Sequence, residues 1–145
     1  MTTPEKTLEL ARQVLAIEAA AIHALSARLD HSFSRAVELC LACSGRIIVS
    51  GMGKSGHIAG KIASTLASTG TPSFFVHPGE ASHGDLGMIT PQDVVIALSN
   101  SGESPELVAI VPLIKRLGAK LITVTGNPQS TMAREADLHL DASVT

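Results

Sequence analysis

Hydroxyl and amide side chains are concentrated in one short stretch, Ser99–Ser104 (SNSGES). It follows the apolar run Asp93–Leu98, which predicts a short buried strand. Ser104 and Pro105 then have the residue types that begin a helix, as N-cap and first helical residue. Backbone N–H groups at a helix N-terminus attract an anion. Because the stretch has no Lys or Arg, neutral donors are predicted to hold a phosphate; the alternative is an ordinary turn with a serine cap.

A glycine-rich stretch, Gly51–Gly56 (GMGKSG), occupies the same position after an earlier predicted strand. It matches the G-x-G-x-x-G pattern of dinucleotide-binding loops, which require an acidic residue at the end of the next strand. That position is His77 here, so binding of a nicotinamide dinucleotide is disfavoured. The stretch does not match the Walker A pattern either. The stretch is predicted to allow close backbone approach, with Ser55 as helix cap. Lys54 either reaches into the cleft or is a solvated loop lysine.

Two histidines and two glutamates complete the candidate set. His77 ends a predicted strand and His83 lies in the following loop, so both are expected on the ligand side. They could act as acid or base, bind a metal, or hold sugar hydroxyls. Glu106 is in the first turn of the helix after the serine stretch, where the helix dipole favours a carboxylate. It is also a candidate general acid or base beside a bound phosphosugar, whereas Glu103 is predicted to serve the geometry of the loop.

Strand and helix patterns alternate over most of the chain. Strands are expected at 46–50, 73–76, 93–98, 119–125 and 137–141, and helices at 55–68, 105–117 and 130–136, with a short helix around 81–86. The alternation predicts an α/β fold with a doubly wound, five-stranded parallel sheet and right-handed crossovers. The carboxyl ends of parallel strands share one edge of the sheet. That edge would therefore gather the serine stretch, the glycine stretch and the histidines.

Two helices are expected before the sheet, which divides the chain into an N-terminal helical segment, 1–45, and an α/β core, 46–145. The first helix has an apolar stripe, and the second is predicted to turn Phe33, Val37 and Leu41 inward. A doubly wound sheet needs helices on both faces. No helix follows the last strand, so the chain is cut short, or the N-terminal helices or another subunit cover that face.

The composition narrows the class of protein. With 145 residues, 45% of them hydrophobic and 17% charged, the chain is expected to form one folded domain with a real core. A net charge of −2, no basic stripe and no Trp or Tyr argue against nucleic acid and anionic membrane as partners. The N-terminus lacks the basic-then-apolar order of a signal peptide. A cytoplasmic location is expected.

Four stretches together resemble the sugar isomerase (SIS) domain of the D-arabinose 5-phosphate isomerase family. They are Gly51–His57, Ala67–His77, His83–Gly87 and Ser99–Ser104. The serine stretch is typical of all SIS domains, whereas the stretch from His77 to Gly87 is much more specific to this family. The resemblance runs from about Arg46 to the end of the chain.

The resemblance implies an aldose–ketose isomerase that interconverts D-ribulose 5-phosphate and D-arabinose 5-phosphate, a step that feeds 3-deoxy-D-manno-octulosonate and lipopolysaccharide synthesis in Gram-negative bacteria. It implies a flavodoxin-like sheet, a homotetramer and no required cofactor, with inhibitory zinc at His77. The matched positions are Lys54 and Glu106 as catalytic groups, joined by His83; Gly70, Thr71, His77 and His83 as substrate contacts; and Ser55, Ser99, Asn100, Ser101 and Ser104 as the phosphate cradle.

The resemblance also implies a continuation that the sequence does not contain. Family members continue with an acidic residue just after the fifth strand, a Ser/Thr-rich helix, a catalytic histidine and usually a pair of CBS domains. Without these, the chain is expected to hold two of the four catalytic positions. The alternative is a non-catalytic phosphosugar-binding SIS module, as in some regulators. Another SIS chemistry, such as amino-sugar isomerisation or ether cleavage, conflicts with the His83–Gly87 stretch.

Overall fold

The computed structural model describes residues 3–81 and 84–144 and divides the chain into two units. One contains the helix α1 (Pro4–Ser26), and the other is a compact unit, His31–Ser143. The elements of the compact unit are α2 (His31–Leu41), β1 (Ile47–Gly51), α3 (Gly53–Ser68), β2 (Ser73–Val76), α4 (Pro78–Ala81), the 3-10 turn η1 (Asp85–Met88), β3 (Val94–Ser99), α5 (Pro105–Leu117), β4 (Lys120–Thr125), α6 (Thr131–Glu135) and β5 (Leu138–Asp141).

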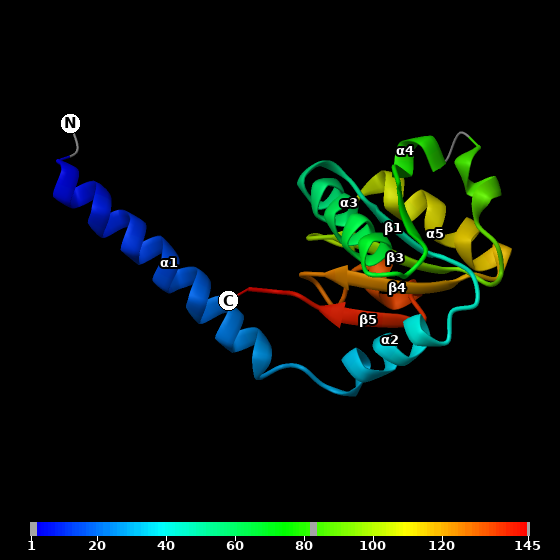
Figure 1. Cartoon of the computed structure of the whole chain (residues 1–145), viewed down its shortest axis with the longest axis horizontal. Coiled ribbons are helices and arrows are strands. Elements are labelled where there is room, and N and C mark those ends of the chain that lie inside the picture. Colours follow the sequence, from blue (N-terminus) through cyan, green and yellow to red (C-terminus); the bar gives the residue numbers. More distant parts are fainter. Residues whose placement is uncertain (1–2, 82–83, 145) are drawn as a thin grey trace. The chain divides into compact units, whose positions relative to one another are not determined.

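Five parallel strands form one sheet in the order β2-β1-β3-β4-β5 (Figure 1). The predicted fold class is confirmed, and every predicted strand begins and ends within one residue of the observed one. The chain runs from β1 outward to β2 and then crosses to β3 on the other side. The switch point, where an open α/β sheet binds its ligand, is therefore between β1 and β3. Gly51 pairs with Leu98 in the register, so the glycine and serine stretches begin beside each other.

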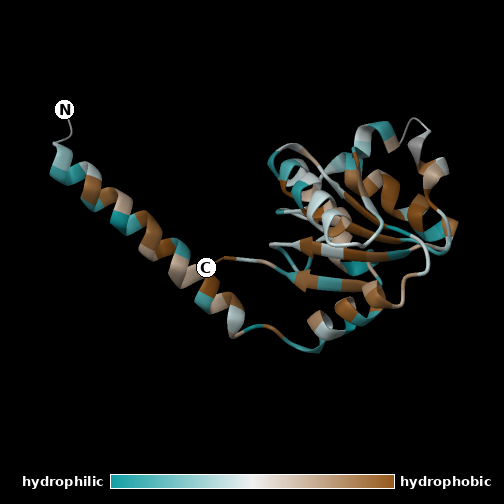
Figure 2. Cartoon of the chain, in the orientation of Figure 1, coloured by the Kyte–Doolittle hydropathy of each residue, from teal (hydrophilic) through white to brown (hydrophobic). Residues whose placement is uncertain are grey.

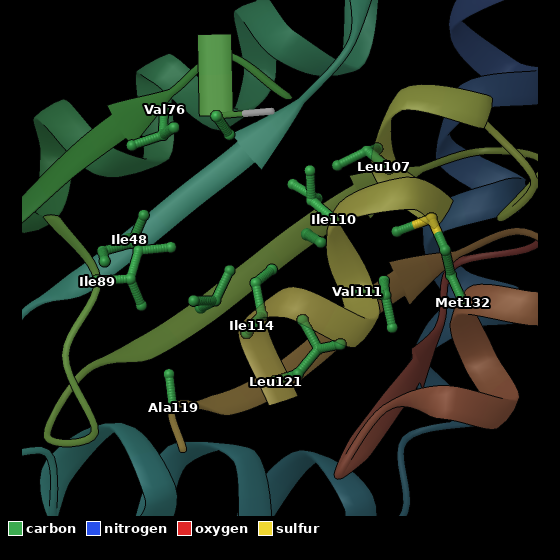
Figure 3. Close-up of a cluster of buried hydrophobic side chains, with 13 residues drawn as sticks. Ile48, Val76, Ile89, Leu107, Ile110, Val111, Ile114, Ala119, Leu121 and Met132 are labelled. Carbon is green, nitrogen blue, oxygen red and sulfur yellow. The ribbon is translucent and has the colours of Figure 1, made fainter. Parts of the chain in front are cut away.

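One face of the sheet is packed against α4, α5 and α6 (Figure 3). Side chains of β1, β3 and β4 meet an apolar stripe on α5 whose members are almost fully buried. The stripe comprises Leu107, Ile110, Val111 and Ile114. Each such side chain contributes about 1.5 to 3 kcal/mol by leaving water. The helix predicted over 105–117 is confirmed. It ends where predicted, because Gly118 adopts φ 83° as the left-handed C-cap.

The opposite face is packed against α2 and α3, mainly through small side chains. Ala36, Ala59 and Ala63 are buried against it. The predicted inward positions of Phe33, Val37 and Leu41 are wrong: all three are exposed, Leu41 by 81%. Because the alanines make the contact, the larger side chains line a groove of about 330 Å³ between α2 and α3.

The long helix α1 forms as predicted. The Oγ1 of Thr3 accepts a hydrogen bond from the Lys6 N–H at 3.3 Å, and Pro4 is the first helical residue. Apolar and polar segments alternate along it (Figure 2). None of its residues is buried, and Ile17 is 69% exposed, so no described residue covers its apolar stripe.

Among the described residues, no single helix is long and apolar enough to span a bilayer. Only α1 and α2 taken as a bent pair have the length and composition of a span.

Candidate functional site

The serine stretch, Ser99–Ser104, forms a loop at the carboxyl edge of the sheet, between β3 and α5. Ser99 is buried, and its Oγ accepts a hydrogen bond from the Gly102 N–H at 3.0 Å. The Oγ atoms of Ser99 and Ser104 lie 2.8 Å apart. Ser104 is the N-cap residue of α5, as predicted, but its hydroxyl makes no capping bond. The first-turn N–H groups of α5 therefore have no side-chain cap, which is the arrangement that suits an anion.

A cavity of about 160 Å³ opens beside this loop. It brings together three of the predicted cradle residues, Ser55 from the first turn of α3 and Ser99 and Asn100 from the end of β3. The other lining residues are Ile58, Leu98, Val124, Thr125, Gly126 and Ala142. Ile58 is 57% exposed, so it forms part of the open wall of this cavity. The sequence analysis missed Thr125 and Gly126, the last residue of β4 and the one after it, although their place at a strand end was the available signal.

Further hydrogen bonds stabilise the conformation of the serine loop. The Ser101 Oγ accepts a hydrogen bond from the Glu103 N–H at 3.2 Å. The Gly126 N–H donates to the Asn100 carbonyl at 2.9 Å. Ser101 and Ser104 belong to the loop but not to the lining of the cavity. Glu106 is exposed in the first turn of α5.

The glycine stretch, Gly51–Gly56, joins β1 to α3 through close backbone packing. A Cβ on Gly51 would lie 2.7 Å from the Ser55 carbonyl oxygen, and one on Gly56 would lie 2.7 Å from the Gly51 carbonyl oxygen. The predicted close approach is confirmed. The prediction that Ser55 caps the helix is wrong: α3 begins two residues earlier, at Gly53, so Ser55 lies inside the first turn and faces the cavity. Lys54 is exposed in the same turn.

A second cavity, of about 220 Å³, lies at the ends of β1 and β2 and includes His57, Phe75 and His77 with three glycines. The His77 Nδ1 accepts a hydrogen bond from the Gly79 N–H at 3.2 Å. A neutral imidazole that accepts at Nδ1 carries its hydrogen on Nε2. His77 is therefore arranged to donate a hydrogen bond to a ligand oxygen. The sequence analysis missed His57, which directly follows the glycine stretch.

Two predicted substrate positions, Gly70 and Thr71, are not brought to these cavities, and a third, His83, lies outside the described residues. Gly70 and Thr71 precede β2, so they lie at the amino edge of the sheet, and Thr71 lines the groove between α2 and α3. The short helix expected around 81–86 includes two residues outside the described ranges; of the others, Ala81 is the last residue of α4 and the 3-10 turn η1 begins at Asp85.

Two ionisable groups near the cavities have shifted pKa values. The hydrogen bond from the Thr131 N–H, assisted by nearby Arg134, lowers the pKa of Glu103. Burial lowers the pKa of His139, against an opposing effect of Asp141. The His139 Nε2 lies 2.9 Å from the Oγ1 of Thr125, so this histidine supports a residue of the cavity wall in its neutral form.

The donor set was tested against the zinc ion that the resemblance implies. Protein zinc sites use three or four side-chain ligands. Among the described residues, no group of three or more His, Cys, Asp or Glu side chains could hold a metal ion. His77 also has its Nδ1 engaged by the Gly79 N–H. The described side chains therefore do not fit a zinc site by themselves.

Residues 40–145 match the family model of the SIS domain. This chain belongs to the SIS domain family. This chain is 60% identical over 134 residues to the arabinose 5-phosphate isomerase KdsD of Pseudomonas aeruginosa, and 59% identical over 133 residues to that of Escherichia coli K12. Each match covers 92% of this chain but only 41% and 40% of the relatives, so the chain spans about two fifths of their length.

A solved structure shares the SIS fold closely. The protein c3406 of Escherichia coli CFT073, in complex with arabinose 5-phosphate, superposes with a TM-score of 0.94 at 40% sequence identity. The match covers 99% of this chain and 77% of that one.

Proposed function

We propose that this SIS domain binds a pentose 5-phosphate and serves the interconversion of D-arabinose 5-phosphate and D-ribulose 5-phosphate. The observation that carries the proposal is the uncapped first turn of α5 at the switch point, beside the paired hydroxyls of Ser99 and Ser104. The proposal is supported by the names of the KdsD relatives and by the arabinose 5-phosphate complex of the solved neighbour.

The phosphate is anchored by neutral donors. The uncapped N–H groups of α5 bear partial positive charge from the helix dipole, and Ser55, Ser99 and Asn100 add side-chain donors from the cavity wall. Ser101 and Ser104 complete the cradle. The sugar then extends toward the second cavity, where His77 and its neighbouring glycines are in position to hold sugar oxygens.

The chemistry is a proton transfer between two carbons. A base removes the C2 proton of arabinose 5-phosphate, and the aldehyde oxygen O1 takes up a proton as the enediol forms. A proton is then delivered to C1 while the C2 hydroxyl gives up its own, which leaves the C2 carbonyl of the ketose. Lys54 or His77 polarises the carbonyl, and His83 is a further candidate. Glu106 is a candidate for the C2 base, together with the acidic residue that the family resemblance implies after the fifth strand. The alternative remains a module that binds the phosphosugar without turnover.

Four finer parts of the proposal rest on the family resemblance. They are a homotetramer, a cytoplasmic location, a place in lipopolysaccharide synthesis, and inhibition by zinc at His77. Because the described side chains do not complete a zinc site, no step of the mechanism is routed through the metal.

Binding and turnover are measured separately on the same chain. Arabinose 5-phosphate at a hundred times its Kd should stabilise the fold by about 2.7 kcal/mol, since it binds only the native state. Arabinose without phosphate is the control and should have little effect. Incubation in D₂O with NMR detection then reports whether deuterium enters at C2 or C1. Stabilisation without exchange supports the binding module, and equal stabilisation by arabinose would refute the phosphate anchor.

A further inference from the structure

The serine loop is fastened to the first turn of α6 by two neighbouring contacts. The Glu103 Oε1 accepts a hydrogen bond from the Thr131 N–H at 2.6 Å. The Gly102 carbonyl accepts one from the Met132 N–H at 3.2 Å. Gly102 has φ 66°, and a Cβ there would overlap the Oγ of Ser130. The serine loop is therefore in direct contact with the first turn of α6 and with Ser130, the residue that precedes it.

These contacts lie in the middle of the proposed phosphate cradle. Glu103 stands between Ser101 and Ser104 in sequence, and its own N–H donates to the Ser101 Oγ at 3.2 Å. Its carboxylate accepts from the first N–H of α6, and this bond lowers the pKa of Glu103. Fixing the carboxylate on α6 thus fixes the backbone from which the cradle hydroxyls project.

We propose that Glu103 is a positioning residue for the phosphosugar site, acting through the Thr131 N–H to hold the serine loop in its binding geometry. The proposal rests on the proposed function only in taking a phosphosugar as the ligand. Because its carboxylate is engaged by α6, Glu103 acts on the cradle and not on the reacting carbons.

Three substitutions separate the bond from the side chain. Glu103→Ala removes the acceptor, and Glu103→Gln retains an oxygen of the same reach without the charge. Thr131→Pro removes the donor N–H, together with the threonine side chain, and leaves Glu103 in place. Thr131 is the first residue of α6, where proline is favoured, and Ser130 has the extended conformation (φ −67°, ψ 159°) that proline requires of the residue before it.

The matched control is Glu135→Ala. Glu135 is a glutamate at the other end of α6, in an exposed ion pair with Lys115 at 3.0 Å. Its loss should leave the affinity for arabinose 5-phosphate unchanged, because it touches neither cavity.

Affinity for arabinose 5-phosphate is measured for each variant and for the double variant Glu103→Ala/Thr131→Pro. We expect about a tenfold loss in Glu103→Ala and in Thr131→Pro, the size of one hydrogen bond to a charged group. The double variant should lose no more than either single one, and Glu103→Gln should recover most of the affinity. Additive losses, or wild-type affinity in Glu103→Ala, would overturn the proposal.

Amide hydrogen exchange without ligand keeps this test apart from that of the proposed function. Glu103→Ala should speed exchange at Thr131 and at the backbone N–H groups of 100–104, whereas Glu135→Ala should not. If the wild-type chain fails to bind arabinose 5-phosphate, the proposed function is wrong. Unchanged exchange at 100–104 in Glu103→Ala would instead show that Glu103 does not hold the loop.

Discussion

Two loops meet at the switch point of the sheet, and they are held in different ways. The glycine loop, Gly51–Gly56, depends on the absence of side chains, because its backbone atoms pack where a Cβ would stand. The serine loop depends on side chains: Ser99, Ser101 and Glu103 each accept a hydrogen bond from a backbone N–H. One loop is thus shaped by steric exclusion and the other by a polar network. The difference predicts which substitutions damage the fold and which damage the site.

The largest effect is expected at the glycine loop. Gly56→Ala places a Cβ 2.7 Å from the Gly51 carbonyl oxygen, and neither backbone segment can move without separating α3 from β1. Urea unfolding should show a loss of about 2 to 3 kcal/mol. The matched control is Gly60→Ala in the same helix, where a Cβ meets no atom within 4 Å. That variant should gain up to about 1 kcal/mol of stability from helix propensity; equal losses in both would refute the steric account.

A smaller loss of stability but a larger loss of binding is expected at the serine loop. Ser99→Ala removes the buried acceptor for the Gly102 N–H and leaves the Ser104 hydroxyl without its partner. The cost in unfolding free energy should be about 1 to 2 kcal/mol, and affinity for arabinose 5-phosphate should fall about tenfold. Ser68→Ala, an exposed serine at the end of α3, is the control and should change neither quantity. Unaltered binding in Ser99→Ala would mean that its hydroxyl is not part of the cradle.

Gly53 allows the cost of an unfavourable backbone angle to be measured apart from the cost of a crowded Cβ. Gly53 has φ 55°, a left-handed conformation, but a Cβ there would meet nothing within 4 Å. Gly53→Ala should therefore cost about 1 kcal/mol, which is the conformational penalty alone. Thermal unfolding beside Gly56→Ala measures the difference. A cost equal to that of Gly56→Ala would show that the backbone angle, and not the close approach, dominates in this loop.

The smallest effect is a dependence on pH in the serine loop. The Thr131 N–H lowers the pKa of Glu103 in the folded state, so the carboxylate stabilises the fold above its ordinary pKa of about 4.3. That contribution should be lost as the pH falls through the folded pKa. Unfolding of the wild type and of Glu103→Gln, followed from pH 6 downward, should show their difference shrinking in acid. A constant difference would indicate that the charge of Glu103 does not matter.

The sequence alone determined the elements whose cause is local. Asp93–Leu98 reads as a buried strand from its β-branched run, and the helix after it is bounded by Pro105 and Gly118, residues that begin and end helices for steric reasons. The glycine-rich pattern of Gly51–Gly56 likewise predicted a close backbone approach, because glycine has no Cβ. Alternation of strands and helices was enough to predict the parallel sheet and the edge at which the ligand site lies.

Only the tertiary structure decided how these pieces meet. The partner of Glu103 is an N–H 28 residues away, and no local pattern specifies that distance in sequence. The apolar stripe of α2 predicts a buried face, but the packing of Ala36 leaves Phe33 and Leu41 exposed. Likewise, Thr71 and His77 flank the same strand yet lie at opposite edges of the sheet. Residue type and period fix an element, whereas strand order and helix placement depend on contacts between residues far apart in the chain.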